Sequence, residues 1–147
     1  MSAFLRVRVH LIWSTHNRQP RIARAWRNDL YGFIRGIGNN LGAPVLKAGG
    51  TDDHVHVDAS LPATLAIADL VNALKANSSR WVHENHDPDF AWQTKYAAFS
   101  VSKSAEPDLL RYIEGQDAHH RHKSFVEELE EFLRRHEIPY DPKYYLE

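Results

Sequence analysis

The strongest constraint on the fold is the order in which strand-like and helix-like apolar spacings follow one another. Over residues 6–15 apolar side chains recur at every second position, which is typical of a strand with one face on a core. Later segments repeat every three or four residues, which predicts amphipathic helices. In chain order we expect a strand at 6–15, a helix ending near Gly42, strands at 43–48 and 54–60, a helix from 67 to 82, an interrupted strand within 90–102, and helices beginning near Pro107 and Ser124.

This order predicts an α+β fold. Strand, helix, strand, strand, helix, strand is the βαββαβ arrangement of ferredoxin-like and RNA-recognition-like domains, an antiparallel sheet with two core helices on one face. The additional C-terminal helices would then cover the opposite face. The length suits one domain over residues 1–147, with 137–147 as a peripheral tail.

The amino-acid composition limits which metal ligands and which cellular locations are possible. The chain has no cysteine, so a metal ion would be held by nitrogen and oxygen ligands. No apolar run approaches the roughly 20 residues that span a bilayer, and the first residues do not resemble a signal peptide. We therefore expect a cytoplasmic protein that does not enter a membrane.

Charge is unevenly distributed although the formal net charge is only −1. Residues 1–36 contain seven arginines and one acid, whereas the chain from Ser124 onward has seven acids and three Arg or Lys residues. A basic first third could follow a phosphate backbone, with Arg6, Arg8, His10 and Arg18 as candidate DNA contacts. Two ordinary solvated faces would explain the same distribution.

Two histidines, His54 and His56, flank one valine in the expected third strand. Alternate residues of a strand point to the same side, so both imidazoles would project from one face and could bind a divalent metal ion. Surface histidines without a metal are the plain alternative. Asp58 is in phase with the pair and could orient an imidazole, but an exposed strand end is the preferred interpretation.

Tyr112 and Gln116 lie four residues apart in a helical pattern, so they would share a helix face. A core aromatic and a solvent-facing glutamine would account for them equally well. Gly115 lies between them and costs a helix roughly 1 kcal/mol relative to alanine, so it either loosens the helix or ends it. The run from His119 to His122 is a rival metal site, but a polar or phosphate-contacting surface is favoured there.

These residues, in this order and spacing, resemble the single-tyrosine HUH transposases, which include the smallest insertion-sequence transposases and the REP-associated tyrosine transposases. The resemblance extends over nearly the whole chain. The segments that carry it are Val9–Thr15 with Arg18, Asp53–His56, Trp92–Ser102, Tyr112–Gln116, His119–His120 and Ser124–Glu128. One departure is visible: Lys95 and Ala97 flank Tyr96 where the family usually has glycines, which bears on how mobile that loop is.

The resemblance implies that His54, His56 and Gln116 bind Mg²⁺ or Mn²⁺ and that Tyr112 is the nucleophile. Attack on single-stranded DNA would give a 5′-phosphotyrosine link and a free 3′-OH, which later reverses the step. The resemblance also implies recognition of imperfect DNA hairpins at element ends, and a homodimer in which the tyrosine helix often completes the partner's site.

Two other functions stay open from the residues alone. One is a non-catalytic module that binds single-stranded nucleic acid on the open sheet, with Trp13, Trp92 and Tyr96 as stacking aromatics. For Trp13, core packing is the favoured interpretation. The other is a metal-dependent phosphoesterase that uses water, in which Tyr112 would be dispensable.

Overall fold

The computed structural model describes residues 3–119 and 123–142. Its centre is a four-stranded antiparallel sheet in the order β2-β3-β1-β4. The strands are β1 (Arg8–Ser14), β2 (Val45–Gly50), β3 (His54–Ser60) and β4 (Ala97–Val101). The α-helices are α1 (Arg24–Asn40), α2 (Ile67–Asn85), α3 (Glu106–Glu114), α4 (Gln116–His119) and α5 (Phe125–Arg135), and short 3-10 turns lie at His16–Arg18 and Lys103–Ala105.

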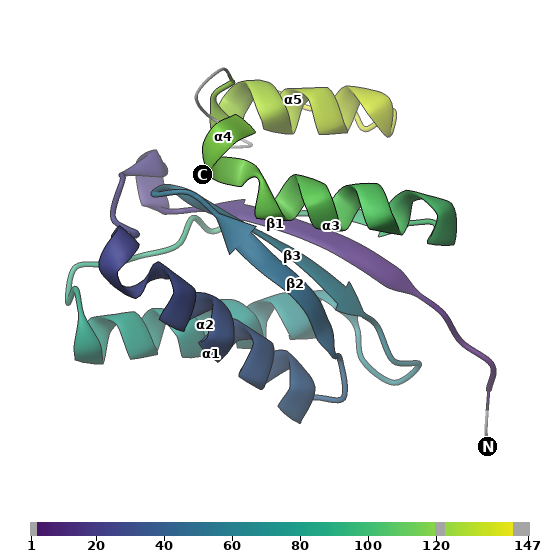
Figure 1. Ribbon diagram of the computed structural model, residues 1–147, viewed down its shortest axis with the longest axis horizontal. Helices are drawn as coiled ribbons and strands as arrows, with labels where there is room; N and C mark the ends of the chain where they lie inside the picture. The colour runs from purple at the N-terminus through teal and green to yellow at the C-terminus, as the bar shows by residue number, and fades with distance from the viewer. Residues whose placement is uncertain (1–2, 120–122, 143–147) are drawn as a thin grey trace.

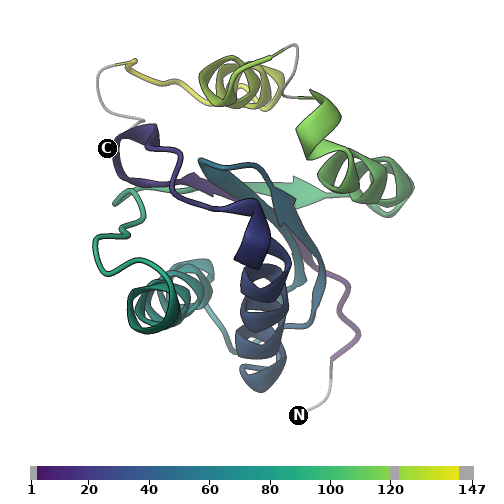
Figure 2. The same cartoon turned by 60° about the vertical axis from the view of Figure 1, so that its left-hand side comes forward.

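Helices cover both faces of this sheet. α1 and α2 lie together on one face, and α3, α4 and α5 lie on the other (Figures 1 and 2). The predicted α+β fold, with two core helices on one face and the tyrosine helix opposite, is confirmed. No helix in the described ranges is both long and apolar enough to cross a bilayer.

The alternation of β1 decides which residues meet which layer. Val9, Leu11 and Trp13 are buried in the main core beneath α1 and α2, as the period of two predicts. His10 and Ile12 point to the other face, where the strand register sets them beside Asp58 and His56 of β3. The histidine pair of β3 therefore faces the layer formed by α3 and α5.

Two expected strands have different boundaries. The strand expected at 43–48 lies at Val45–Gly50, so the two glycines expected in a turn belong to its end. Of the segment 90–102 only Ala97–Val101 forms β4, while Trp92 makes an isolated bridge to Thr15. Burial explains why β4 does not begin earlier: Phe90 and Trp92 pack into the main core, so this part of the chain does not continue the strand.

A second, smaller apolar cluster holds α5 on the sheet. Its buried members are Ile12, Phe99, Phe125, Leu129 and Leu133, and it is separate from the nineteen-residue main core. α5 begins with the expected capping box, since the Ser124 hydroxyl accepts from the Glu127 amide and donates to the Glu127 carboxylate. Of the expected tail, residues 137–142 are described, and Tyr140 packs against this cluster.

Candidate active site

The strand β3 and the end of the tyrosine helix bring four predicted site residues together. His54 and His56 are fully buried, and Gln116 places its Oε1 3.0 Å from His54 Nε2. The amide nitrogen of Gln116 donates to the Tyr112 carbonyl at 3.3 Å, which leaves the oxygen facing His54. The Tyr112 ring lies 5.6 Å from the His56 ring, edge to face. All four meet within a single chain.

The approach of α3 to the sheet depends on a glycine. A Cβ on Gly49 would lie 2.8 Å from the Ile113 carbonyl oxygen, which is closer than real Cβ atoms come. The bare backbone of β2 thus lets α3 pack closely, and this places Tyr112 above β3. α3 ends at Glu114 and Gln116 opens α4, so of the two roles expected for Gly115 the structure shows the helix end.

Each histidine is oriented by a partner on its second ring nitrogen. His54 Nδ1 lies 2.7 Å from Asp53 Oδ1 and 3.0 Å from the Thr51 hydroxyl. His56 Nδ1 lies 2.8 Å from His10 Nε2. Both Nε2 atoms are thereby turned toward the same space. Outer partners of this kind fix the tautomer and ring orientation of metal-binding histidines.

His10 is suited to accept a hydrogen bond from the His56 ring. Burial, and then the neighbouring His56, lower the pKa of His10 well below its usual value, so its ring stays neutral. A neutral His10 with its proton on Nδ1 can accept from His56 Nδ1, and His56 Nε2 is then the ring nitrogen that faces Glu128 and the other donors. His10 was expected on this face of the sheet as a DNA contact, whereas here it is buried beside His56.

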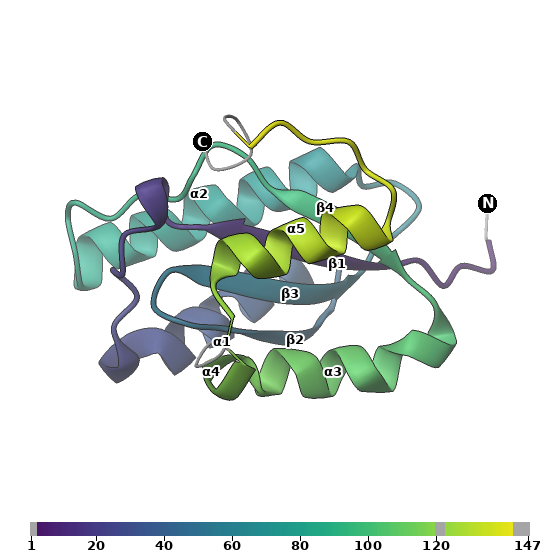
Figure 3. The same cartoon turned by 90° about the horizontal axis from the view of Figure 1, so that it is seen from above.

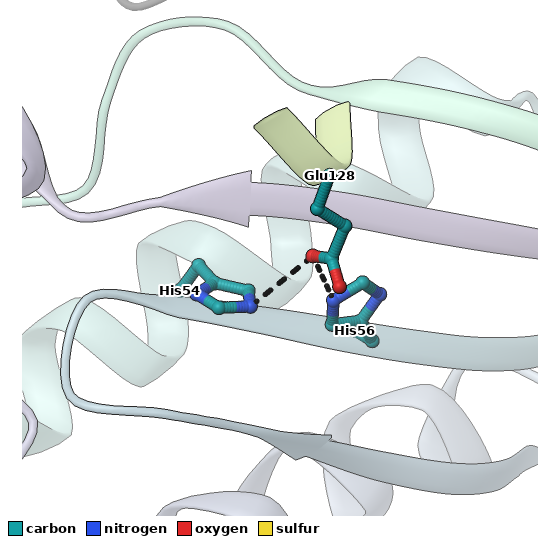
Figure 4. Close-up of side chains that lie close together, drawn as sticks. All are labelled: His54, His56 and Glu128. Carbon is teal, nitrogen blue, oxygen red and sulfur yellow. Dashed lines mark hydrogen bonds and ion pairs between the residues drawn. The ribbon is translucent and has the colours of Figure 1, made fainter. Parts of the chain in front are cut away.

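Glu128 of α5 is the site residue that sequence reasoning missed. It is 1% exposed, and its Oε1 lies 2.9 Å from His56 Nε2 and 3.4 Å from His54 Nε2 (Figure 4). Its Oε2 accepts a hydrogen bond from the Tyr112 hydroxyl. A signal was present, because Glu128 lies in the buried stripe of α5 with Phe125 and Leu129, where an acid needs a polar partner.

The donor atoms fit a divalent cation. His54, His56 and Glu128 each offer one donor within 4.8 Å of the others, and Gln116 adds an amide oxygen. Neighbouring ligands around a six-coordinate ion at about 2.1 Å lie about 3 Å apart. His54 Nε2 and Gln116 Oε1 are 3.0 Å apart, and Glu128 Oε1 lies 2.9 Å from His56 Nε2 and 3.4 Å from His54 Nε2. Two imidazole nitrogens together with carboxylate and amide oxygens are donors that bind a divalent metal ion.

Tyr112 is held as a neutral phenol in this arrangement. Burial, and then the negative charge of Glu128, raise the pKa of Tyr112 far above its usual value. His119 Nε2 also lies 3.3 Å from the Tyr112 hydroxyl. The rest of the expected histidine cluster, residues 120–122, lies outside the described residues.

The predicted DNA contacts occupy different environments. Arg6 and Arg8 both pair with Glu106 at the start of α3, and His10 is only 2% exposed. Arg18 is exposed and has a positive φ of 56°. DNA binding by any of these residues stays a prediction, and in this conformation Arg6 and Arg18 are the exposed ones among the four.

Two further expectations concern burial. Asp58, expected at an exposed strand end, is buried, and its Oδ2 lies 3.7 Å from Arg8 Nη1. Trp13 is fully buried, which confirms core packing, and Trp92 is 8% exposed. Of the three proposed stacking aromatics, only Tyr96 has a substantial exposed area.

Metal affinity should rise with pH because a proton competes for His54. Burial alone would lower the pKa of His54, but hydrogen bonds to the carboxylates of Asp53 and Glu128 outweigh it and raise the pKa to about 9. A bound ion needs the unprotonated Nε2, so the apparent affinity should fall about tenfold per pH unit below 9. Calorimetric Mn²⁺ titrations in buffers of different ionisation enthalpy should show proton release at pH 7.5. A pH-independent affinity between 7 and 8.5 would contradict this.

The part of the chain that holds most of these site residues is similar to known proteins. Residues 3–116, more than three quarters of the chain, match the family described as "Transposase IS200 like". The chain belongs to the IS200-like transposase family.

Among the relatives of this IS200-like transposase is the ISDra2 transposase TnpA of Deinococcus radiodurans. The two are 29% identical over 114 residues, which cover 73% of this chain and 81% of the relative. A crystal structure from Deinococcus radiodurans, described as a transposase, superposes with a TM-score of 0.64 at 24% identity over 79% of this chain and 95% of the other. A REP-associated tyrosine transposase bound to a REP hairpin has a similar fold, with a TM-score of 0.61 at 14% identity over 82% and 74%.

Family membership implies DNA cleavage and transfer activity for this transposase. The matched residues include His54, His56, Tyr112 and, as the last one, Gln116. Glu128 and the whole of α5 lie beyond the matched segment.

Proposed function

We propose that this transposase cuts and rejoins single-stranded DNA, with Tyr112 as the nucleophile and a divalent cation held by His54, His56 and Gln116. One observation carries the proposal: a tyrosine hydroxyl and two imidazole nitrogens contact the same buried carboxylate, that of Glu128, and the Gln116 amide oxygen lies 3.0 Å from one of these nitrogens. A nucleophile beside a set of metal donors is what metal-assisted phosphodiester transesterification requires.

In the proposed step, Tyr112 Oη attacks the scissile phosphorus. The Oη–P bond forms as the P–O3′ bond breaks, Tyr112 Oη gives its proton to water, and the departing O3′ takes a proton from water. The products are a 5′-phosphotyrosine and a free 3′-OH, and attack by a 3′-OH reverses the step without ATP. When bound, the cation would polarise the phosphate and balance the charge that develops on its oxygens.

The remaining residues position these groups. Asp53 and Thr51 orient His54, His10 orients His56, and the bond from Gln116 to the Tyr112 carbonyl couples the amide ligand to the nucleophile's backbone. Groups that are fixed before the substrate arrives need little reorganisation during reaction.

We further propose that the substrate is DNA with an imperfect hairpin and that the protein acts as a homodimer. The relative bound to a REP hairpin and the family membership support the first part. Since all four groups meet within one chain, a dimer is not required to complete the site in this conformation.

The test uses hairpin oligonucleotides copied from palindromes beside the gene and labelled at the 3′ end. Attack by tyrosine leaves the 3′ fragment on the protein, so the label should move to a denaturation-resistant protein band with Mn²⁺ and not with EDTA. The unlabelled 5′ fragment should carry a free 3′-OH that a polymerase extends. DNA binding that needs no metal and yields no adduct would instead support a non-catalytic module.

A further inference from the structure

Two arginines hold a single carboxylate at the start of α3, the helix that carries Tyr112. Arg6 Nη2 donates to one oxygen of Glu106, and Arg8 Nη1 donates to the other. Behind them, the buried carboxylate of Asp58 lies 3.7 Å from Arg8 Nη1 and helps to fix this guanidinium. Two guanidiniums that each bind one oxygen of an anion also suit the two non-bridging oxygens of a phosphodiester. We call the guanidiniums of Arg6 and Arg8 the arginine fork.

The arginine fork lies on the face of the sheet that carries the candidate active site. Arg8 and His10 are two residues apart in β1, so their side chains leave the same face. α3 begins at the end of the sheet where β1 begins, and it lies beside α5 on this face (Figure 3). The side chains of Arg6, Arg8 and Glu106 are 40%, 15% and 14% exposed. The arginine fork is therefore within reach of a phosphate from solvent.

A cavity of about 290 Å³ leads from the nucleophile toward the arginine fork. Along α3 it is lined from Tyr112 to Ala105, the neighbour of Glu106, a span of about 10 Å. On β4 it is lined by Val101, which pairs with Arg8 in the sheet. Aromatic side chains, which stack with unpaired bases, line it as well: Phe99, Phe132 and His136. A DNA strand that reaches Tyr112 along this cavity brings a neighbouring phosphate to the arginine fork.

Glu106 stands in the way of that phosphate. It neutralises charge that would attract the DNA backbone, and a phosphodiester cannot take both guanidiniums until the carboxylate has left. α3 has other attachments to the sheet, since Ile113 packs against Gly49 and Glu114 pairs with Lys47 at the far end of the helix. The Glu106 side chain can therefore turn away while α3 stays in place.

We propose that Arg6 and Arg8 bind a backbone phosphate of the unpaired DNA strand that leads to Tyr112, and that Glu106 occupies this phosphate site in the DNA-free protein. The proposal rests on the proposed function, because it takes Tyr112 as the point that the strand must reach. The phosphate bound here is a neighbour of the scissile one and takes no part in the chemistry. Binding exchanges one anion for another at the arginine fork, so Glu106 lowers both the DNA affinity and its dependence on salt.

Glu106→Gln removes the competing charge and keeps the size of the side chain. We expect this variant to bind hairpin DNA with unpaired flanks about tenfold more tightly, and the slope of log affinity against log salt to steepen by about 0.7. Most of this gain should be lost when Arg6→Gln is added, because half of the arginine fork is then missing. Asp108→Asn is the matched control: it removes one charge from the same helix at a side chain that pairs with Arg111. It should change the affinity less than about twofold.

Binding is measured by fluorescence anisotropy in EDTA, without metal and without cleavage, so the result does not depend on the proposed chemistry. A methylphosphonate removes the charge of one phosphate, and at one position of the flank it should abolish the advantage of Glu106→Gln. An advantage that persists at every flank position, or on a hairpin without flanks, would overturn the proposal. An equal gain in Asp108→Asn would do the same. Wild-type DNA affinity in Glu106→Gln, with a lower melting temperature, would show that the ion pairs only stabilise the fold.

Discussion

Replacing Tyr112 with phenylalanine is expected to abolish the covalent protein–DNA adduct, by at least about 10³-fold relative to the wild-type protein. The substitution removes one oxygen and keeps the ring, whose edge-to-face contacts with His56, His119 and Phe132 can persist. Gel analysis of 3′-labelled hairpin DNA with Mn²⁺ gives the measurement.

The control for this variant is Tyr96→Phe, which makes the same change at a partly exposed ring outside the donor cluster. It should form adduct at the wild-type rate. Metal-dependent cleavage that continues in Tyr112→Phe without an adduct would show that water is the nucleophile, and an undiminished adduct would remove Tyr112 from its role.

His54→Ala and His56→Ala should each weaken Mn²⁺ binding at least about 100-fold and remove metal-dependent cleavage. Even partners that only orient metal-binding histidines are worth 10- to 100-fold in affinity, and a lost ligand should cost no less. Calorimetry measures the affinity, and the wild-type gain in melting temperature on adding Mn²⁺ should disappear.

Each of these variants also removes one of the partners of the buried Glu128 carboxylate, so folding has to be measured separately. His86→Ala is the matched control, because His86 is exposed at the end of α2 and stacks on Trp26 away from the donor cluster. Full Mn²⁺ affinity in folded His54→Ala or His56→Ala would exclude the metal site proposed here.

Local spacing predicted much of the fold. The strand from His54 to Ser60 is found where alternation placed it, and Ser124 caps α5 as its capping box predicts. The prediction for β2 was wrong at its end. Gly49 and Gly50 are typical of a turn, but they belong to the strand, and Gly49 is needed for the packing of α3. That requirement comes from a helix more than fifty residues downstream, which no local pattern contains.

The site residues, too, fall into those that local spacing predicted and those that depend on contacts between distant segments. Two-residue spacing on a strand and four-residue spacing near a helix end predicted His54, His56, Tyr112 and Gln116 as two pairs, and the resemblance joined them. Glu128 and the coupling of His10 to His56 depend on contacts between distant segments. Glu128 could have been flagged as an acid within the apolar stripe of α5, but its partners could not have been named.

The most direct test of Tyr112 as the nucleophile is to find the residue to which the DNA is covalently attached. Adduct formed with Mn²⁺ is digested with nuclease and trypsin, and the peptide that retains a phosphonucleotide is identified by mass spectrometry. Cleavage after Arg111 and Arg121 places Tyr112 in a peptide with no other tyrosine, residues 112–121. We expect the modification on Tyr112 in this peptide; a phosphonucleotide on any other residue, with an unmodified 112–121 peptide, would contradict Tyr112 as the nucleophile.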